Sequence, residues 1–222
     1  MTADRITTQL RDVTVVYRSA GEQITALDGV ALDVASGEAV VIAGPSGSGK
    51  STMLRLLAGF DQPSAGTVMV DGVELSALGE ARRRRFRRGR LAVVHQRPLN
   101  NLIGDLTAAQ HVDLAGRVRR RRTPADVLAR FGLGERRDAL PRHLSGGEQQ
   151  RLAIAMAVAS GVSVILADEP TAELDRAHAQ EVIDALRGLA GDGVTVVTAS
   201  HDADVVGALG RVVRMRDGAV VT

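Results

Sequence analysis

Cysteine is absent from this chain of 222 residues, and lysine is nearly absent. The lack of cysteine excludes disulfide bonds and thiolate metal sites, as is typical of proteins from a reducing cytoplasm. Among the 28 basic residues Lys50 is the only lysine, and the others are all arginine. The chain also has no tryptophan and one tyrosine. Basic strands interleaved with aromatic side chains, which bind single-stranded nucleic acid, are therefore not expected.

Long apolar runs are missing as well. The longest uncharged stretch, residues 152–167, contains Ser160, Gly161 and Ser163 and is shorter than the roughly 18 apolar residues that mark a spanning helix. The N-terminus lacks the basic and then apolar order of a signal peptide. We expect a cytoplasmic chain that does not itself cross a membrane and that forms one domain over residues 1–222.

Positive and negative charges nearly balance, and the net charge of +2 does not predict a nucleic-acid partner. Two arginine clusters stand out, at residues 82–90 and 119–122. One interpretation is a solvated surface in an arginine-biased chain. The alternative is contact with anionic lipid headgroups or with a partner protein.

The apolar pattern predicts an α/β fold. Strands are expected within residues 6–35, with turns at 19–22 and 36–37, and at residues 38–43, 67–70, 91–94, 162–167 and 194–199, with a closing hairpin over 211–222. Helices are expected at 52–57, 147–159 and 176–190. This order predicts a mostly parallel core sheet (residues 1–96 and 160–222) with an antiparallel β front subdomain and an inserted helical subdomain at about 97–159.

The lone lysine lies in a glycine-rich segment that fits G-x-x-x-x-G-K-[ST]. Its members are Gly44, Pro45, Ser46, Gly47, Ser48, Gly49, Lys50, Ser51 and Thr52. In such a loop, backbone N–H groups surround phosphates, the lysine reaches the β- and γ-phosphates, and the serine hydroxyl ligates Mg²⁺. A compact ammonium fits this narrow nest, whereas a planar guanidinium does not. Because a predicted strand precedes the segment and a predicted helix follows it, we expect a nucleotide site, not a turn that binds nothing.

Two further segments carry candidate chemistry. An apolar strand ends in Asp168 and Glu169, where Asp168 can hold Mg²⁺ and Glu169 can deprotonate the attacking water. The segment LSGGEQQR places Ser145 three residues before Glu148, as a capping box requires, and Gly146 and Gly147 leave backbone N–H groups open to an anion. The chain therefore has two anion-binding elements, and we expect the second to serve a nucleotide held by another copy. The simpler alternatives are solvated carboxylates and an ordinary capped helix.

In order and spacing, these motifs resemble the nucleotide-binding subunit of ATP-binding cassette (ABC) transporters over essentially the whole chain. The resemblance rests on residues 44–52, Gln96, residues 144–151, 164–171 and 173–175, and His201. It implies an ABC ATPase fold with a P-loop NTPase core, ATP and Mg²⁺ as ligands, and a homodimer. Each ATP would lie between the phosphate loop of one subunit and Ser145 of the other.

The resemblance also implies individual roles. Tyr17 would stack on adenine, Gln96 would contact Mg²⁺ and face the membrane partner, Asp175 would communicate across the dimer, and His201 would contact the γ-phosphate. Tyr17 as plain core and His201 as a satisfied strand-end residue are the alternatives. The other histidines, His95, His111, His143 and His178, are expected at the surface or in packing.

Within the family, the segment around Gly21 and residues 101–108 resemble the branch that works with lipoprotein-release, macrolide-efflux and cell-division permeases. The expected function is an ATPase subunit that powers a separate permease, at the inner face of the membrane, most simply for export or lipoprotein release. A cell-division regulator and a nucleic-acid-linked ATPase are the alternatives. Three positions depart from the family pattern, His95, Glu173 and the Ala199-Ser200 pair.

The segment from Gln96 to Leu106 is expected to couple the ATPase to its permease. It carries the apolar residues Leu99, Leu102, Ile103 and Leu106 among polar ones. Exposed side chains of this kind can dock a helix of a partner. The alternative is that they pack beneath the helical subdomain.

Overall fold

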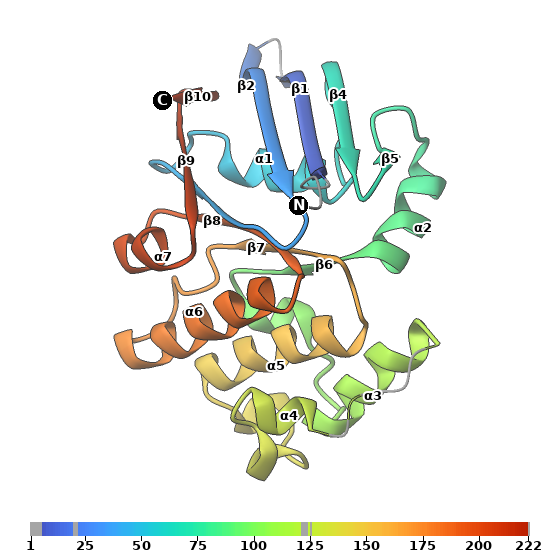
Figure 1. Cartoon of the computed structure of the whole chain (residues 1–222), viewed down its shortest axis with the longest axis vertical. Coiled ribbons are helices and arrows are strands. Elements are labelled where there is room, and N and C mark those ends of the chain that lie inside the picture. The colour runs from blue at the N-terminus through green and yellow to red at the C-terminus, as the bar shows by residue number, and fades with distance from the viewer. Residues whose placement is uncertain (1–5, 20–21, 121–123, 125, 222) are drawn as a thin grey trace, which may run out of the picture.

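The computed structural model describes residues 6–19, 22–120, 124 and 126–221. Two β-sheets and a set of helices form the molecule (Figure 1). The front sheet is antiparallel in the order β2-β1-β4-β5 and consists of β1 (Ile6–Ser19), β2 (Glu22–Ala35), β4 (Ala65–Val70) and β5 (Val73–Glu74). This sheet is the predicted antiparallel front subdomain. Part of the turn expected at 19–22 lies outside the described residues.

The core sheet has the order β10-β9-β3-β8-β7-β6. Its strands are β3 (Ala39–Ala43), β6 (Leu91–Val94), β7 (Val164–Asp168), β8 (Thr195–Ser200), β9 (Arg211–Arg216) and β10 (Ala219–Val221). All neighbours pair in parallel except β10, which forms the expected hairpin with β9. The predicted mostly parallel sheet is therefore present.

Side chains along the core strands alternate between two apolar clusters. In β3, Val40 and Ile42 belong to the cluster shared with the front sheet and α1 (Lys50–Leu57), whereas Val41 belongs to the cluster on the helical face. Successive residues of a strand point to opposite faces, so a strand covered on both sides must be apolar throughout. This is why strands β3, β6 and β7 read as apolar runs.

The helical face of the core sheet is covered by α3 (Ala108–Val118), α4 (Val127–Arg130), α5 (Gly146–Ala159), α6 (Arg176–Gly191) and α7 (Ala203–Ala208). Short 3₁₀ turns at η1 (Pro98–Asn101), η2 (Gly134–Arg136) and η3 (Pro141–His143) connect them. Helix α5 packs against both α3 and α6, so the stretch expected as an inserted helical subdomain shares one apolar cluster with the core. In the part of the chain that the structure describes, no helix is both long and apolar enough to span a membrane.

Helix α2 (Glu80–Arg90) carries the first arginine cluster and leads into the edge strand β6. A solvated helix face was one interpretation of this cluster, and α2 is a helix with most of its arginines exposed. Phe86 is its one buried apolar side chain. Ion pairs and carbonyl contacts of buried arginines replace the apolar face that a surface helix usually presents.

Candidate nucleotide-binding and catalytic site

The glycine-rich loop joins β3 to α1, and close packing explains its glycines. A Cβ at Gly44 would lie 2.3 Å from the carbonyl oxygen of Met215, and one at Gly49 would lie 2.5 Å from that of Ala26. Gly49 also has φ = 99°, a left-handed conformation that side chains disfavour. Helix α1 begins at Lys50, two residues earlier than expected from sequence. The first helical turn therefore includes Lys50 and Ser51.

Lys50 is buried at the centre of this loop, with 6% of its surface exposed. Its Nζ donates to the carbonyl oxygens of Gly44 at 2.8 Å and Pro45 at 3.0 Å, and it lies 3.8 Å from Glu169 Oε1. The ammonium thus sits where the loop can present it to phosphate oxygens. Ser48 Oγ is buried without a partner among the described residues, so the loop has unused polar capacity.

Ser51 and Asp168 form the second part of the site. Ser51 Oγ donates to Asp168 Oδ1 at 3.1 Å, and Asp168 is the last residue of β7. Burial raises the pKa of Asp168 above its ordinary value, and the negative charge of Glu169 adds to the effect. These hard oxygen groups suit Mg²⁺, which takes few protein ligands together with substrate phosphates. Among the described residues no group of three or more His, Cys, Asp and Glu could hold a metal.

Glu169 follows directly and gathers three polar side chains. Its Oε1 lies 2.8 Å from His201 Nδ1, and its Oε2 accepts from Ser200 Oγ at 3.2 Å. Lys50 approaches the same Oε1. The backbone of Glu169 is left-handed, with φ = 46°, which is strained for this residue type. A carboxylate held in this way by a lysine and a histidine is positioned to accept a proton from water.

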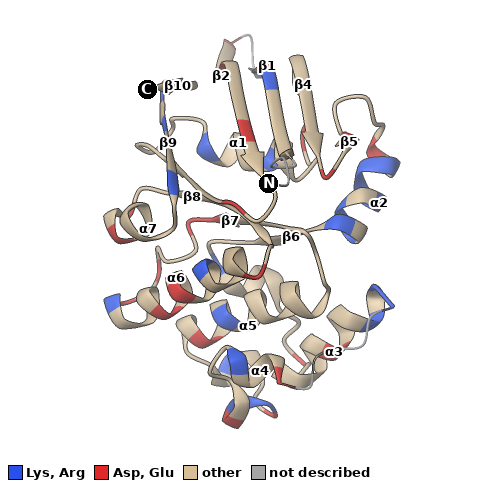
Figure 2. Ribbon diagram, in the orientation of Figure 1, with Lys and Arg blue, Asp and Glu red and all other residues tan. Residues whose placement is uncertain are grey.

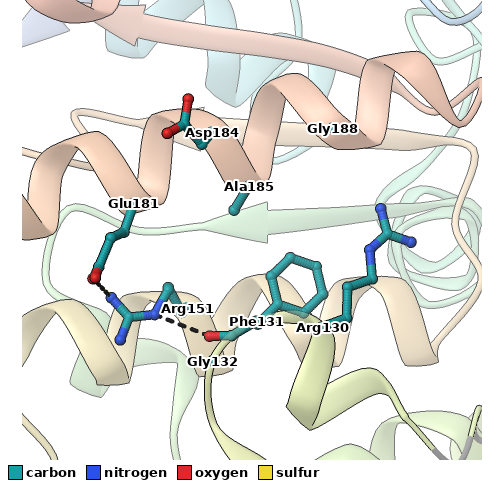
Figure 3. Close-up of a pocket in the computed structure, with 8 residues that line it drawn as sticks. All are labelled: Arg130, Phe131, Gly132, Arg151, Glu181, Asp184, Ala185 and Gly188. Atoms are coloured by element: carbon teal, nitrogen blue, oxygen red, sulfur yellow. Dashed lines mark hydrogen bonds and ion pairs between the residues drawn. The ribbon is translucent and has the colours of Figure 1, made fainter.

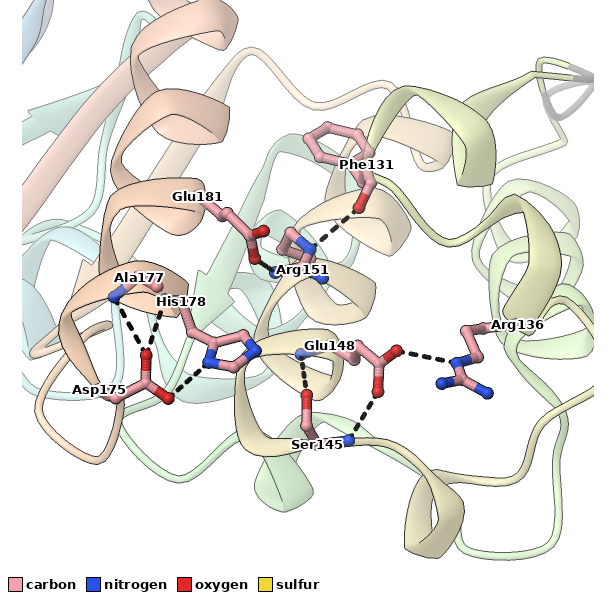
Figure 4. Close-up of polar contacts among 9 residues, drawn as sticks. All are labelled: Phe131, Arg136, Ser145, Glu148, Arg151, Asp175, Ala177, His178 and Glu181. Carbon is pink, nitrogen blue, oxygen red and sulfur yellow. Dashed lines mark hydrogen bonds and ion pairs between the residues drawn. The ribbon is translucent and has the colours of Figure 1, made fainter.

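The Ser145 turn is a complete capping box at the start of α5 (Figure 4). Ser145 Oγ accepts from the Glu148 backbone N–H at 3.2 Å, and Glu148 Oε2 accepts from the Ser145 N–H at 2.8 Å. Arg136 Nε donates to Glu148 Oε1 at 2.9 Å. Burial acts to raise the pKa of Glu148, but the Ser145 N–H and Arg136 outweigh it, and the pKa is lowered. Glu148 is thus held as a carboxylate, while Ser145 stays exposed to a ligand.

Asp175 caps α6, and His178 connects it to the Ser145 turn. Asp175 Oδ1 accepts from the backbone N–H groups of Ala177 at 3.0 Å and His178 at 3.1 Å, and Asp175 Oδ2 lies 2.6 Å from His178 Nδ1 (Figure 4). The His178 N–H and imidazole lower the pKa of Asp175. A Cβ on Gly147 would come within 2.8 Å of His178. Sequence reasoning placed His178 only at the surface or in packing and missed this link, because α5 and α6 meet only in the folded chain.

Tyr17 is 42% exposed, so it is not a core residue. Its hydroxyl donates to Asp61 Oδ2 at 3.0 Å, and Asp61 is held by both Nε and Nη2 of Arg55 at 2.7 Å. Arg55 belongs to α1, the helix that leaves the glycine-rich loop. Gln96 is exposed just beyond β6 and lines a cavity of about 340 Å³ together with Gly146 and Glu173.

The segment from Gln96 to Leu106, called here the coupling segment, has some apolar side chains that are exposed and others that are partly covered. Leu99 and Ile103 are 58% and 50% exposed. Leu102 is half-buried and packs against the helical-face cluster, so its expected exposure is wrong. The Ile103 N–H donates to Nε2 of the fully buried His111 at 2.8 Å, and His111 Nδ1 lies 2.8 Å from Thr107 O. The segment is therefore attached to α3.

A cavity of about 420 Å³ lies between α4, α5 and α6 (Figure 3). On its wall Arg151 donates to the Phe131 carbonyl oxygen at 3.0 Å and forms an ion pair with Glu181. Arg130 at its rim pairs with Asp192. The charged side chains Arg130, Arg151 and Glu181 on the cavity wall are therefore already paired, and the Arg151–Glu181 pair joins α5 to α6.

The fold and these contacts define the class of protein. A glycine-rich loop between a parallel strand and a helix, with Ser51 against Asp168 and Lys50 beside Glu169, is the nucleotide site of a P-loop NTPase.

Comparison with known proteins gives the family. The ABC transporter family model matches residues 27–172. The chain is 40% identical to an ABC transporter ATP-binding protein of Thermotoga maritima, over 96% of this chain and 92% of that protein. It is also 40% identical to the macrolide export ATP-binding/permease protein MacB of a Shewanella species, over 96% of this chain. The chain spans 34% of the length of that MacB. The chain belongs to the ABC transporter family as an ATP-binding cassette, and it is an ATPase.

Solved structures agree on the fold. A dimeric structure of the bacterial ABC transporter cassette MJ0796 has a TM-score of 0.84 at 35% identity, and covers 97% of each chain. A second MJ0796 dimer, in a post-hydrolysis state with ADP and phosphate, has a TM-score of 0.83 at 34% identity, again over 97% of each chain. The predicted ABC ATPase fold is confirmed.

Proposed function

We propose that two copies of this chain close head to tail around two Mg-ATP, and that closure and reopening drive a membrane permease of the export or lipoprotein-release type. The likeness to MacB and the dimeric form of MJ0796 support this proposal. The chain would then work at the cytoplasmic face of the membrane. Substrate choice would belong to the permease.

The observation that carries the proposal is the separation of two phosphate-binding elements. Lys50, Ser51, Asp168, Glu169 and His201 form one contact network. Within the described residues, no hydrogen bond or ion pair joins the Ser145 turn to that network, although the turn is fully formed and exposed. A second copy placed head to tail would bring its Ser145 turn to the first copy's nucleotide.

Each group then has a role in hydrolysis. Lys50 and the loop N–H groups bind the β- and γ-phosphates, and Ser51 and Asp168 hold Mg²⁺, which offsets charge that develops on the phosphate oxygens. Glu169 takes a proton from the attacking water, while His201 fixes its Oε1. Tyr17 stacks on the adenine ring, and Gln96 faces the permease. Asp175 is joined through His178 to the Ser145 turn, so the two elements facing the other copy move together.

The test uses Glu169→Gln, which should bind ATP, hydrolyse it very slowly and accumulate as a closed dimer. Gel filtration with and without Mg-ATP measures the dimer. Adding Ser145→Arg to this variant should prevent the dimer yet leave ATP binding by the monomer unchanged in a fluorescent-nucleotide titration, since the phosphate loop is intact.

Ser36→Arg, at an exposed turn serine, is the matched control and should leave the Glu169→Gln dimer intact. Loss of monomer ATP affinity in the Ser145→Arg variant would place that serine at the nucleotide of its own chain. A Glu169→Gln protein that stays monomeric at saturating Mg-ATP would contradict the dimer itself.

A further inference from the structure

Helix α2 uses some of its arginines in ion pairs within the helix and with the turn at Asp71. Arg83 and Arg87 both donate to Glu80, at 2.9 Å and 3.3 Å, and Arg90 donates to Asp71 Oδ2 at 2.9 Å. Arg83 is buried and Arg87 is half-buried. These three side chains form the inner side of the helix, and their charges are compensated within the chain.

The outer side of α2 is different. Arg82, Arg84, Arg85 and Arg88 are exposed, and within the described part of the chain none of their side chains takes part in a hydrogen bond or ion pair. At about 100° per residue, these four side chains lie on one face, which contains no acidic residue. Like charges three and four residues apart destabilise a helix. Contact with a negatively charged surface would therefore offset this repulsion and stabilise the helix.

The second arginine cluster meets the first in space. Arg119 Nη2 donates to the carbonyl oxygens of Arg87 at 3.3 Å and Leu91 at 2.9 Å, so the end of α3 lies against the end of α2 on the same side of the molecule (Figure 2). Beyond this contact α3 exposes two aliphatic side chains one turn apart, Leu114 at 38% and Val118 at 64%. Arginines 121 and 122 lie outside the described residues.

We propose that this combined surface binds the anionic phospholipid headgroups of a membrane. The surface, called here the α2–α3 surface, consists of Arg82, Arg84, Arg85, Arg88, Leu114 and Val118. Guanidinium groups pair with headgroup phosphates, and exposed aliphatic side chains enter the acyl boundary. A single-stranded nucleic acid is a poorer fit because its bases stack on exposed aromatic groups, and none of the six residues of this surface is aromatic. An acidic protein surface would satisfy the arginines but not the aliphatic pair.

Vesicle binding by the whole chain, without nucleotide or permease, tests this surface independently of the proposed transport function. Wild type should bind vesicles of phosphatidylcholine mixed with phosphatidylglycerol and not vesicles of phosphatidylcholine alone. Binding should weaken as salt rises from about 0.1 to 1 M, because the Debye length falls from about 10 to 3 Å. The variant with Arg82, Arg84, Arg85 and Arg88 all changed to Gln should bind at least about tenfold more weakly, since each basic residue contributes roughly a fivefold factor.

The matched control changes four exposed arginines on other elements to Gln and so has the same net charge. Its positions are Arg11, Arg137, Arg214 and Arg216. Circular dichroism should show both variants folded, because all eight substituted arginines are exposed. Equal loss of binding in the two variants would overturn the proposal, because net charge alone would then explain it. Tighter binding of wild type to RNA or poly-aspartate than to anionic vesicles would also overturn it.

Discussion

At the scale of single residues, the site depends on the shape of the charged side-chain group as well as on the sign of its charge. Lys50 reaches two carbonyl oxygens and approaches Glu169 from within a loop in which Gly44 and Gly49 have no room for a Cβ. A guanidinium spreads the same charge over a planar group with five donors. The chain uses arginine at every other basic position, so this pocket selects the compact cation.

Lys50→Arg should therefore lower steady-state ATP hydrolysis by at least about 100-fold, comparable to the loss of a group that stabilises charge in the transition state. The fold should survive, which thermal unfolding would show. Near-normal turnover of this variant would contradict the steric explanation of the lone lysine.

Asp61 gives a residue-scale prediction about pH. The bidentate hydrogen bond from Arg55 lowers the pKa of Asp61, although burial acts against it. Because the folded-state pKa is lowered, the stabilisation is present above the ordinary aspartate pKa of about 3.9 and is lost as the pH falls through the folded value. Asp61→Asn should reduce the free energy of unfolding by about 1 kcal/mol at neutral pH, since the pair is partly exposed.

Chemical denaturation at several pH values measures this difference, which should shrink in acid. Asp138→Asn, at an exposed position without an ion pair, is the control and should cost little at any pH. A deficit of Asp61→Asn that persisted unchanged below pH 3 would show that shape and not charge is responsible.

At the scale of elements, ion pairs join helices that are far apart in the chain. The Arg151 side chain is only 11% exposed and links α5 to α6 through Glu181, which is 54% exposed. Its Nε is held separately by the Phe131 carbonyl oxygen (Figure 3). Removing the partner of a largely buried cation leaves a charge that is poorly solvated.

Glu181→Gln should thus lower the free energy of unfolding by about 1 to 2 kcal/mol, less than for a fully buried pair because Glu181 itself is exposed. Urea unfolding measures it. Asp184→Asn on the same helix breaks an ion pair between two exposed side chains, at 57% and 55%, and should change stability by less than about 0.5 kcal/mol. Equal effects of the two substitutions would contradict the importance of burial.

At the scale of the whole molecule, the exposed part of the coupling segment is expected to meet the permease. Leu99 and Ile103 are exposed, whereas Leu102 is half-buried and packs against the helical-face cluster. The Ile103 N–H is attached to buried His111, so a force on this segment reaches α3 directly. The same segment begins at Gln96, close to the Ser145 turn across a shared cavity.

Leu99→Asp with Ile103→Asp should leave the chain folded and able to bind ATP, yet prevent its co-purification with a permease from detergent extract. The matched control places aspartate at two other exposed aliphatic residues, Ile24 and Val221 at 59% and 41%, and should retain the permease. If the variant with Leu99→Asp and Ile103→Asp still co-purified with the permease, these two residues would not form the coupling surface. Leu102→Asp is unsuitable, because it would place a charge in the core.

The sequence by itself determined the features that depend on neighbours along the chain. Apolar runs predicted the core strands because both faces of each strand are covered, and the capping box of Ser145 and Glu148 formed as expected. The glycine-rich loop with Lys50 was recognisable because its glycines and lysine occupy fixed positions relative to one strand and one helix. These patterns are local, so no knowledge of distant contacts was needed.

Only the tertiary structure decided which distant residues meet. Parallel pairing of β7 with β8 brings Glu169 to His201, and the crossing of α5 and α6 brings Gly147 to His178. Arg119 joined two arginine clusters that sequence kept separate, and the fold packed Leu102 against the helical-face cluster but exposed Ile103. Periodicity tells which face of an element is apolar, but not which element covers that face. That choice depends on strand order and helix crossing, which arise only when the whole core packs.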